Sequence, residues 1–292
     1  MISAQGTEHR IRLADERTLA CLELGDPKGA PVIYFHGFPG SRLEAGLAAD
    51  AAQRLGLRLF APDRPGFGES TFLPSRTISN WAADVAELTD QLGLQRFAVV
   101  GVSGGGPYAL ACAARIPRRL HGVAIVGALA PLAGMRSTRG MLARNRLALA
   151  LAAYSPTLAR LVIEPAARWV RRRPARFIAR MAADAPVADR AVLADEGYRA
   201  IFTASTAEAL RQGGHGPALE LALLARAWGF ELQEVSIPVR IWQGLSDNIV
   251  PPAMAQRLAA KLPRSETHWL PAEGHLSVIV RRLDAVLEDL CR

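Results

Sequence analysis

The sequence predicts an α/β fold whose mostly parallel sheet carries a helical insertion. Short apolar runs rich in Val, Ile and Phe alternate with longer amphipathic segments as far as Ala130, which is the pattern of a parallel sheet flanked by helices. The alternation stops there and resumes at Val239. We therefore expect one α/β core formed by residues 1–130 and 233–292, with residues 131–232 inserted as a helical cap.

The core elements follow from hydrophobic periodicity. Arg10 to Leu13 and Thr18 to Leu24 predict an antiparallel pair of strands. Short apolar runs predict four buried strands after them: Pro31 to Phe35, Leu57 to Ala61, Arg96 to Val102 and Leu120 to Gly127. Large apolar residues recur at three- and four-residue spacing from Ile78 to Leu92, so a helix is expected there, with Ser79 as its N-cap.

The inserted segment shows no strand-like run. It is rich in Ala, Leu and Arg, and we expect helices with breaks at Pro156, Pro165, Pro174 and Pro186. The remaining chain predicts a strand, a helix, a strand and a final helix, in this order: Val239 to Gln243, Ala253 to Lys261, Glu266 to Leu270 and His275 to Leu290.

Length and composition limit the class of protein. The chain has 292 residues, 50% of them hydrophobic, which is enough for one large core. It contains no run of eighteen apolar residues, so no transmembrane segment is expected, and residues 1–10 do not resemble a secretory signal. The 3 cysteines are far apart and lack metal-ligand spacing. We expect a reducing, cytoplasmic environment without disulfides.

Basic residues exceed acidic residues, giving a net charge of +8. Because only Lys28 and Lys261 are lysines, we attribute this excess to an arginine bias across the sequence. No nucleic-acid-binding module is visible, so no nucleic-acid partner is expected. The dense stretch Arg168 to Arg180 leaves two interpretations open. It could contact a phosphate, a carboxylate or an anionic lipid surface, or it could be the solvated face of a helix.

A G-x-S-x-G pattern covers residues 101–105. A β-branched run precedes it and a predicted helix, Pro107 to Arg115, follows it, which is the strand–turn–helix setting of a nucleophile elbow. The turn strains the serine backbone, and Gly101 and Gly105 provide small neighbours that avoid a clash. We predict that Ser103 is a nucleophile at the carboxyl edge of the sheet. The alternative is a glycine-rich turn with an idle serine.

The loop His36 to Gly40 follows the third predicted strand. Acyl transfer requires two backbone N–H groups directed at the developing oxyanion. We predict that Phe38 and Gly104 provide them, since Pro39 has no N–H. His36 is expected to support the loop and not to act as a base.

A general base is expected near the end of the chain, because the order of residues in such sites is serine, acid, histidine. Among the 6 histidines, His275 lies between the last predicted strand and the last helix, at the same sheet edge as Ser103. His268 falls within a strand, where it faces packing or solvent. His215 lies in a glycine-rich stretch, which favours a turn residue over a pocket residue.

Asp247 is the predicted acid. It directly follows an apolar strand, and one helix and one strand separate it from His275. The alternative role is a turn or helix-cap aspartate. The stretch Gly127 to Gly134, after the preceding strand, contains no carboxylate. Asp63 also ends a strand but precedes Ser103 in the chain, and we interpret it as a residue that fixes its loop.

These motifs together resemble the α/β-hydrolase superfamily, in particular its serine-nucleophile, esterase-like or lipase-like members with a helical cap. The matching segments extend over essentially the whole chain: His36–Gly40, Asp63–Ser70, Gly101–Gly105, Gly244–Asp247 with Val250–Pro251, and Gly274–His275. The resemblance implies a mostly parallel sheet of eight strands, the triad of Ser103, Asp247 and His275, and no metal or organic cofactor. Members that act on haloalkanes or epoxides carry aspartate at the elbow, so the serine disfavours those reactions.

The resemblance leaves the reaction open. The leading hypothesis is a carboxylic-ester hydrolase that acts on a small, partly apolar acyl substrate. The alternatives are carbon–carbon bond hydrolysis, or cofactor-free perhydrolysis or haloperoxidation, with the same three residues. A further alternative is a non-catalytic binding protein on this fold. The sequence predicts no acyl preference and no oligomeric state, and it leaves peripheral membrane contact open.

Overall fold

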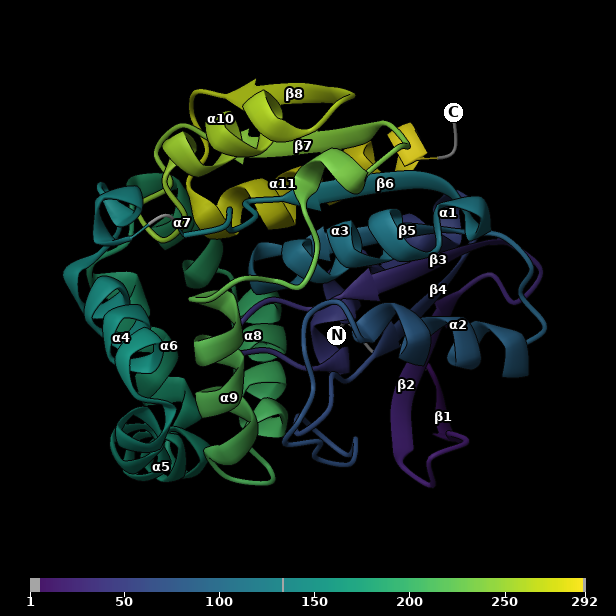
Figure 1. Ribbon diagram of the computed structural model, residues 1–292. Helices are drawn as coiled ribbons and strands as arrows, with labels where there is room; N and C mark the ends of the chain where they lie inside the picture. Colours follow the sequence, from purple (N-terminus) through teal and green to yellow (C-terminus); the bar gives the residue numbers. More distant parts are fainter. Residues whose placement is uncertain (1–5, 133, 291–292) are drawn as a thin grey trace.

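The computed structural model describes residues 6–132 and 134–290 as one eight-stranded sheet flanked by helices (Figure 1). The strand order is β1-β2-β4-β3-β5-β6-β7-β8, and only the β1–β2 and β2–β4 pairs are antiparallel. The predicted α/β fold with a mostly parallel sheet of eight strands is confirmed. The strands are β1 Thr7–Arg12, β2 Thr18–Gly25, β3 Ala30–Phe35, β4 Leu57–Pro62, β5 Phe97–Val102, β6 Leu120–Val126, β7 Val239–Gly244 and β8 Ser265–Leu270.

The central strands are apolar on both faces because helices cover both sides of the sheet. Phe97 and Val99 of β5 point into one hydrophobic cluster, whereas Ala98 and Val100 point into the other, as the two-residue period of a strand requires. Helices α2 (Trp81–Gln91), α3 (Gly106–Arg115) and α10 (Pro252–Lys261) cover the first face. Helices α1 (Ala49–Arg54) and α11 (His275–Leu290) cover the second.

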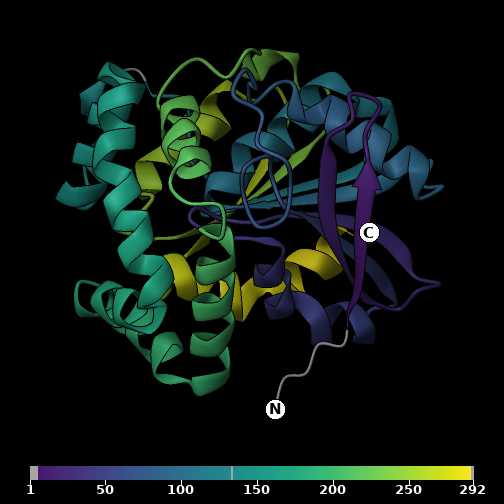
Figure 2. The same cartoon turned by 90° about the horizontal axis from the view of Figure 1, so that it is seen from below.

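Six α-helices separate β6 from β7 within the described residues: α4 Ala143–Tyr154, α5 Pro156–Arg172, α6 Pro174–Ala183, α7 Val187–Ala194, α8 Glu196–Ala209 and α9 His215–Leu224. They lie together beside the carboxyl edge of the sheet, on the left in Figure 1 and in the perpendicular view of Figure 2. This segment corresponds to the predicted helical insertion, whose limits at residues 131 and 232 remain predictions. None of the described helices has the length and apolar character that crossing a bilayer requires.

Two local predictions differ from the structure. Helix α2 has Asn80 as its N-cap residue, and the Ser79 hydroxyl instead accepts a hydrogen bond from Arg115. The Thr77 and Asn80 side chains bond each other and form the turn before the helix. Pro165 lies inside α5 and does not end it, whereas Pro156 and Pro174 open α5 and α6 at the first helical turn, where a missing N–H costs nothing.

Candidate active site

Ser103 stands on a sharp turn between β5 and α3. Its φ angle is +52°, a region that non-glycine residues rarely occupy. The surrounding glycines make this turn sterically possible: a Cβ atom on Gly105 would lie 2.1 Å from the Phe35 carbonyl oxygen, and one on Gly101 would lie 2.6 Å from the Gly105 carbonyl oxygen. The turn therefore holds the serine hydroxyl at the carboxyl edge of the sheet, as the sequence pattern predicts.

The structure brings the three predicted triad residues together at this edge. We call the hydrogen-bonded series of Ser103, His275 and Asp247 the relay. His275 Nε2 lies 3.0 Å from the Ser103 hydroxyl, and His275 Nδ1 lies 2.7 Å from the Asp247 carboxylate. With the Nδ1 proton directed at Asp247, Nε2 is left as the acceptor for the serine proton. All three side chains are buried, so the hydrogen bonds are shielded from bulk water.

The pKa of His275 is raised above its ordinary value of 6.5. Burial alone disfavours the imidazolium, but the charge and hydrogen bond of Asp247 outweigh this effect, and Asp189 and Glu44 add to it. Asp247 is itself fixed, because it accepts hydrogen bonds from the backbone N–H groups of Ile249 and Val250, both at 2.8 Å. The site therefore favours the protonated histidine that proton transfer from a serine creates.

The two predicted oxyanion donors are neighbours. A Cβ atom on Gly104 would lie 3.5 Å from the Phe38 nitrogen, so the two backbone segments face each other beside Ser103. The Phe38 N–H has no acceptor among the residues that the structure describes. It is thus available for a ligand oxygen.

Arg64 supports this loop from behind. Its guanidinium donates to the carbonyl oxygens of His36 (2.6 Å) and Gly37 (3.1 Å). The Gly37 carbonyl and the Phe38 N–H belong to the same peptide group. A cation on the carbonyl oxygen polarises that group and makes the N–H a stronger donor.

Glu220 of α9 balances Arg64. The two form a fully buried ion pair with an N–O distance of 2.9 Å, and Glu220 also accepts hydrogen bonds from Arg76 (2.6 Å) and from the Tyr108 hydroxyl (2.7 Å). Burial disfavours the charge of Glu220, but the two guanidinium groups and the hydroxyl outweigh it and hold its pKa below the ordinary range. A helix of the insertion is thereby tied to the loop that carries Phe38.

Glu44 holds the same loop from the opposite side. Its Oε1 atom accepts hydrogen bonds from the Gly37 N–H (2.7 Å) and from the Tyr34 hydroxyl (2.9 Å). Burial raises the pKa of Glu44, although these hydrogen bonds partly oppose the shift. The Ser41-x-x-Glu44 spacing resembles a capping box, but the carboxylate turns to Gly37, so local sequence does not indicate this role.

Asp189 was also not predicted by the sequence. It lies on α7, is fully buried, and accepts hydrogen bonds from the backbone N–H groups of His275 (2.9 Å) and Ser277 (2.8 Å). These N–H groups form the first turn of α11, where a carboxylate satisfies unpaired donors and interacts with the helix dipole. Asp189 therefore connects the insertion to the backbone that carries His275.

A cavity of about 470 Å³ opens in front of Ser103. Ser103, His275, Glu44, Arg144 and Asn145 contribute polar groups, whereas most of the wall is apolar. The apolar part comes mainly from the inserted helices and includes Leu149, Ile163, Val170, Phe177, Ile178, Met181, Phe202 and Leu221. The cavity thus combines a polar reactive end with an apolar chamber.

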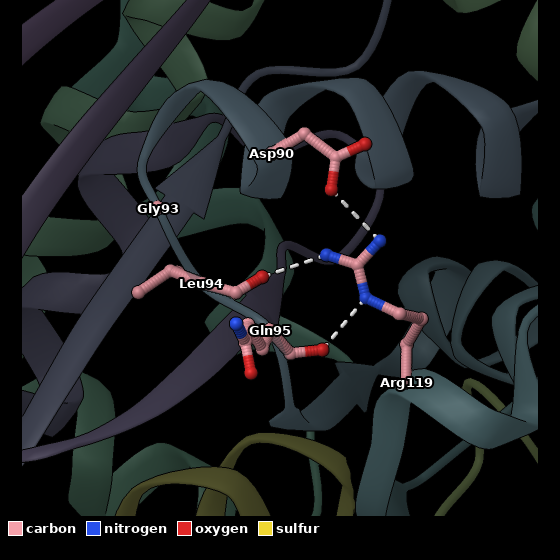
Figure 3. A pocket seen from close by; sticks show the side chains of 5 residues that line it. All are labelled: Asp90, Gly93, Leu94, Gln95 and Arg119. Carbon is pink, nitrogen blue, oxygen red and sulfur yellow. Dashed lines mark hydrogen bonds and ion pairs between the residues drawn. The ribbon is translucent and has the colours of Figure 1, made fainter.

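A second cavity, of about 420 Å³, lies at the opposite end of β5 and β6 (Figure 3). Its two charged residues, Arg119 and Asp90, form an ion pair, and Arg119 also donates to the carbonyl oxygens of Leu94 and Gln95. The polar groups therefore bind each other, and we assign this cavity a structural role only.

The other residues singled out in the sequence lie outside the relay. His36 is fully buried, its Nδ1 donates to the Gly37 carbonyl, and burial lowers its pKa, so it supports the loop as expected. Asp63 fixes its loop by accepting hydrogen bonds from Arg42. His268 stacks on Trp242, and His215 begins α9 beside Phe72.

Cys291 lies outside the described residues, which contain no cluster of His, Cys, Asp and Glu suited to a metal ion.

Comparison with known proteins shows partial sequence matches to curated relatives. A proline iminopeptidase of Xanthomonas citri is 34% identical over 109 residues, 36% of this chain and 34% of that protein. A bifunctional esterase/perhydrolase of Acinetobacter calcoaceticus is 37% identical over 93 residues, 31% of this chain and 34% of that protein. This chain therefore matches only about a third of the length of these curated relatives.

Similarity in fold extends over the whole chain. An esterase from Exiguobacterium antarcticum superimposes with a TM-score of 0.71 and 15% identity, covering 98% of this chain and 100% of that one. The sequence model of the alpha/beta hydrolase fold family matches residues 30–281, which include all five predicted site residues. The chain therefore belongs to the alpha/beta hydrolase fold family.

Proposed function

We propose that the protein is a serine hydrolase that cleaves a carboxylic ester, or a related acyl bond, of a small apolar substrate. The observation that carries this proposal is the hydrogen-bonded relay from Ser103 through His275 to Asp247 at the end of an apolar cavity. A binding protein without catalytic function has no need for a strained serine at φ +52° beside a buried, acid-paired histidine.

In the first step, His275 Nε2 takes the proton of Ser103 as the serine oxygen attacks the acyl carbon. The backbone N–H groups of Phe38 and Gly104 donate to the oxyanion of the tetrahedral intermediate. Asp247 stabilises the imidazolium that forms. When the intermediate collapses, His275 returns the proton to the leaving alcohol and the acyl group remains on Ser103.

Water completes the cycle. It loses a proton to His275 as it attacks the acyl-enzyme, and the second intermediate releases the acid and restores the Ser103 hydroxyl. Every step uses groups of this chain, so the proposed reaction requires no metal or organic cofactor. The sparse cysteines, of which Cys21 and Cys112 are free thiols, support a reducing, cytoplasmic setting.

The cavity limits the substrate to a small molecule. With a volume of about 470 Å³ and a mostly apolar wall, it suits an acyl chain of short to medium length. The partial match to an esterase/perhydrolase supports one second candidate, perhydrolysis, in which hydrogen peroxide replaces water at the acyl-enzyme.

The proposal is tested with a fluorophosphonate probe and an ester panel. We expect the probe to label Ser103, as located by peptide mass spectrometry, and p-nitrophenyl esters of graded chain length to be hydrolysed. Labelling without ester turnover would favour carbon–carbon bond hydrolysis or perhydrolysis. Absence of labelling at Ser103 in folded protein would contradict an activated serine.

The raised pKa of His275 predicts a pH profile. The base must be neutral to accept the serine proton, so kcat/KM should be full above the pKa of His275 and fall as pH drops through it. The midpoint should lie above 6.5, the ordinary histidine value.

Replacing Asp247 with Asn should lower kcat by about 10⁴-fold and move the midpoint to lower pH, because the charge that raises the pKa of His275 is gone.

Rates measured from pH 5 to 9 provide this test. The matched control is Asp284→Asn, the same change at an exposed position of α11, which should leave the profile unaltered. An Asp247→Asn variant with wild-type kcat would show that another residue orients the histidine.

A further inference from the structure

We propose that helices α4, α5 and α6 form a docking surface for a lipid bilayer with anionic headgroups. Charge is distributed unevenly along the chain. Residues 143–180 contain nine of the 35 basic residues and one of the 27 acidic residues, so this segment carries a net charge of +8. The rest of the chain is balanced, with 26 of each. The net charge is therefore concentrated here, unlike the even arginine bias that we expected.

Most of these arginines have no carboxylate partner. Within the part of the chain that the structure describes, only Arg144 and Arg168 of the nine form ion pairs, with Asp184 and Glu164. The guanidinium groups of Arg172, Arg173 and Arg176 are left to solvent. Such unpaired donors on a surface suit phosphate groups, which guanidinium binds through two parallel hydrogen bonds.

Helix α5 also carries an exposed apolar stripe. Leu158, Leu161 and Val162 are 46%, 66% and 60% exposed, although leucine and valine usually face the interior. Together with exposed Pro165 they recur at helical spacing, so they share one face. Arg168 and Arg172 continue the same face along the helix by the same spacing.

Helix α4 extends this surface. Leu147 and Tyr154 are 71% and 84% exposed and lie seven residues apart, on one side of the helix. Only Ser155 separates α4 from α5, and the two helices pack against each other. In Figure 1, α4, α5 and α6 lie at the left edge of the molecule, on the side of α8 and α9 that faces away from the sheet.

An apolar stripe surrounded by arginines is the composition of a helix that lies in a membrane interface. The apolar side chains enter the acyl region while the basic groups bind anionic headgroups, and each signal alone gives only weak attachment. The inner sides of α4 and α5 line the cavity through Leu149, Ile163 and Val170. Docking would therefore place the bilayer next to the chamber that, on the proposed function, receives an acyl chain.

Other occupants fit less well. A second copy of this chain would bring two segments of net charge +8 against each other. A nucleic acid would use the arginines but has no partner for Leu158, Leu161 and Val162, which would remain exposed.

The test uses full-length protein carrying Ser103→Ala, so that binding is measured without turnover. Cosedimentation compares phosphatidylcholine vesicles with vesicles containing equal parts of phosphatidylcholine and phosphatidylglycerol. We expect partitioning into the anionic vesicles to be at least tenfold stronger and to weaken as salt is raised.

Two triple variants identify the surface. Arg172→Gln, Arg173→Gln and Arg176→Gln together should lower partitioning about 100-fold. Leu158→Ser, Leu161→Ser and Val162→Ser together should also reduce it, because the apolar contribution is lost. The matched control removes the same charge elsewhere, through Arg118→Gln, Lys261→Gln and Arg264→Gln at exposed positions, and should bind vesicles as Ser103→Ala does.

The proposal is overturned if partitioning is equal for neutral and anionic vesicles or if the arginine triple binds as strongly as the control. It is also overturned if duplex DNA binds and vesicles do not, or if the chain forms a dimer that the leucine triple dissolves. These outcomes are independent of the catalytic proposal. In a Ser103-containing protein, the arginine triple should keep its kcat/KM for a soluble ester, since none of its three residues lines the cavity.

Discussion

Replacing Ser103 with alanine should lower kcat for a short p-nitrophenyl ester by about 10⁶-fold. On the proposed mechanism the hydroxyl oxygen forms the acyl-enzyme, and no other group among the described residues lies within hydrogen-bond distance of His275 Nε2 to replace it. The cavity and the oxyanion donors remain, so substrate binding should change little. Initial rates over a range of substrate concentrations, with labelling by a fluorophosphonate probe, measure the effect.

Two further variants separate chemistry from folding. Ser103→Gly should lose the same activity, yet its free energy of unfolding should rise by about 1 kcal/mol, because glycine adopts a φ of +52° without strain. Ser246→Ala removes an exposed hydroxyl on the loop beside Asp247 and should keep wild-type rates. Ester hydrolysis by Ser103→Ala above about 1% of wild type would exclude Ser103 as the nucleophile.

The fold and the relay could be predicted because each depends on local patterns. Apolar runs define the buried strands, and the turn at Ser103 requires a glycine within it, because a Cβ atom on Gly101 would lie 2.6 Å from the Gly105 carbonyl oxygen. Asp247 and His275 each follow a strand of the same parallel sheet, so they must reach the same edge. The place of each residue directly after a strand was therefore enough to predict that the two side chains lie close together.

The residues that support the relay could not be predicted in this way. Arg64 and Glu220 are 156 residues apart, and Asp189 and His275 are 86 apart. Each pair joins the core to the inserted helices, whose placement on the sheet depends on packing rather than on periodicity. A buried acid on an Ala- and Leu-rich helix, such as Glu220 on α9, was the only available signal, and it names no partner.

The second large effect is expected at Glu220. Glu220→Gln should lower the free energy of unfolding by about 3–5 kcal/mol, because Arg64 and Arg76 would remain buried without a carboxylate. Urea denaturation followed by tryptophan fluorescence measures this loss. Glu196→Gln, which breaks an exposed ion pair with Arg199 on α8, is the matched control and should keep the wild-type midpoint.

The net charge of the buried cluster predicts which of two variants loses more stability. Arg64, Arg76 and Glu220 together carry one excess positive charge. Arg76→Met removes that excess and leaves a neutral Arg64–Glu220 pair, so it should destabilise the protein less than Glu220→Gln does. Equal losses would show that packing, rather than charge, holds the cluster together.

Loss of Glu220 should also lower the rate of the proposed reaction. Without its carboxylate, Arg64 is no longer fixed against the Gly37 carbonyl, and the peptide group that presents the Phe38 N–H loses both its orientation and its polarisation. Arg64→Lys keeps the positive charge but loses the planar guanidinium that donates to two carbonyl oxygens at once. We expect it to lower kcat by about 10- to 100-fold while KM changes little. Affinity for a boronic acid, whose tetrahedral adduct with Ser103 carries the oxyanion, should fall by the same factor. A rise in KM with unchanged kcat and boronate affinity would show that the arginine supports substrate binding and not the oxyanion donor.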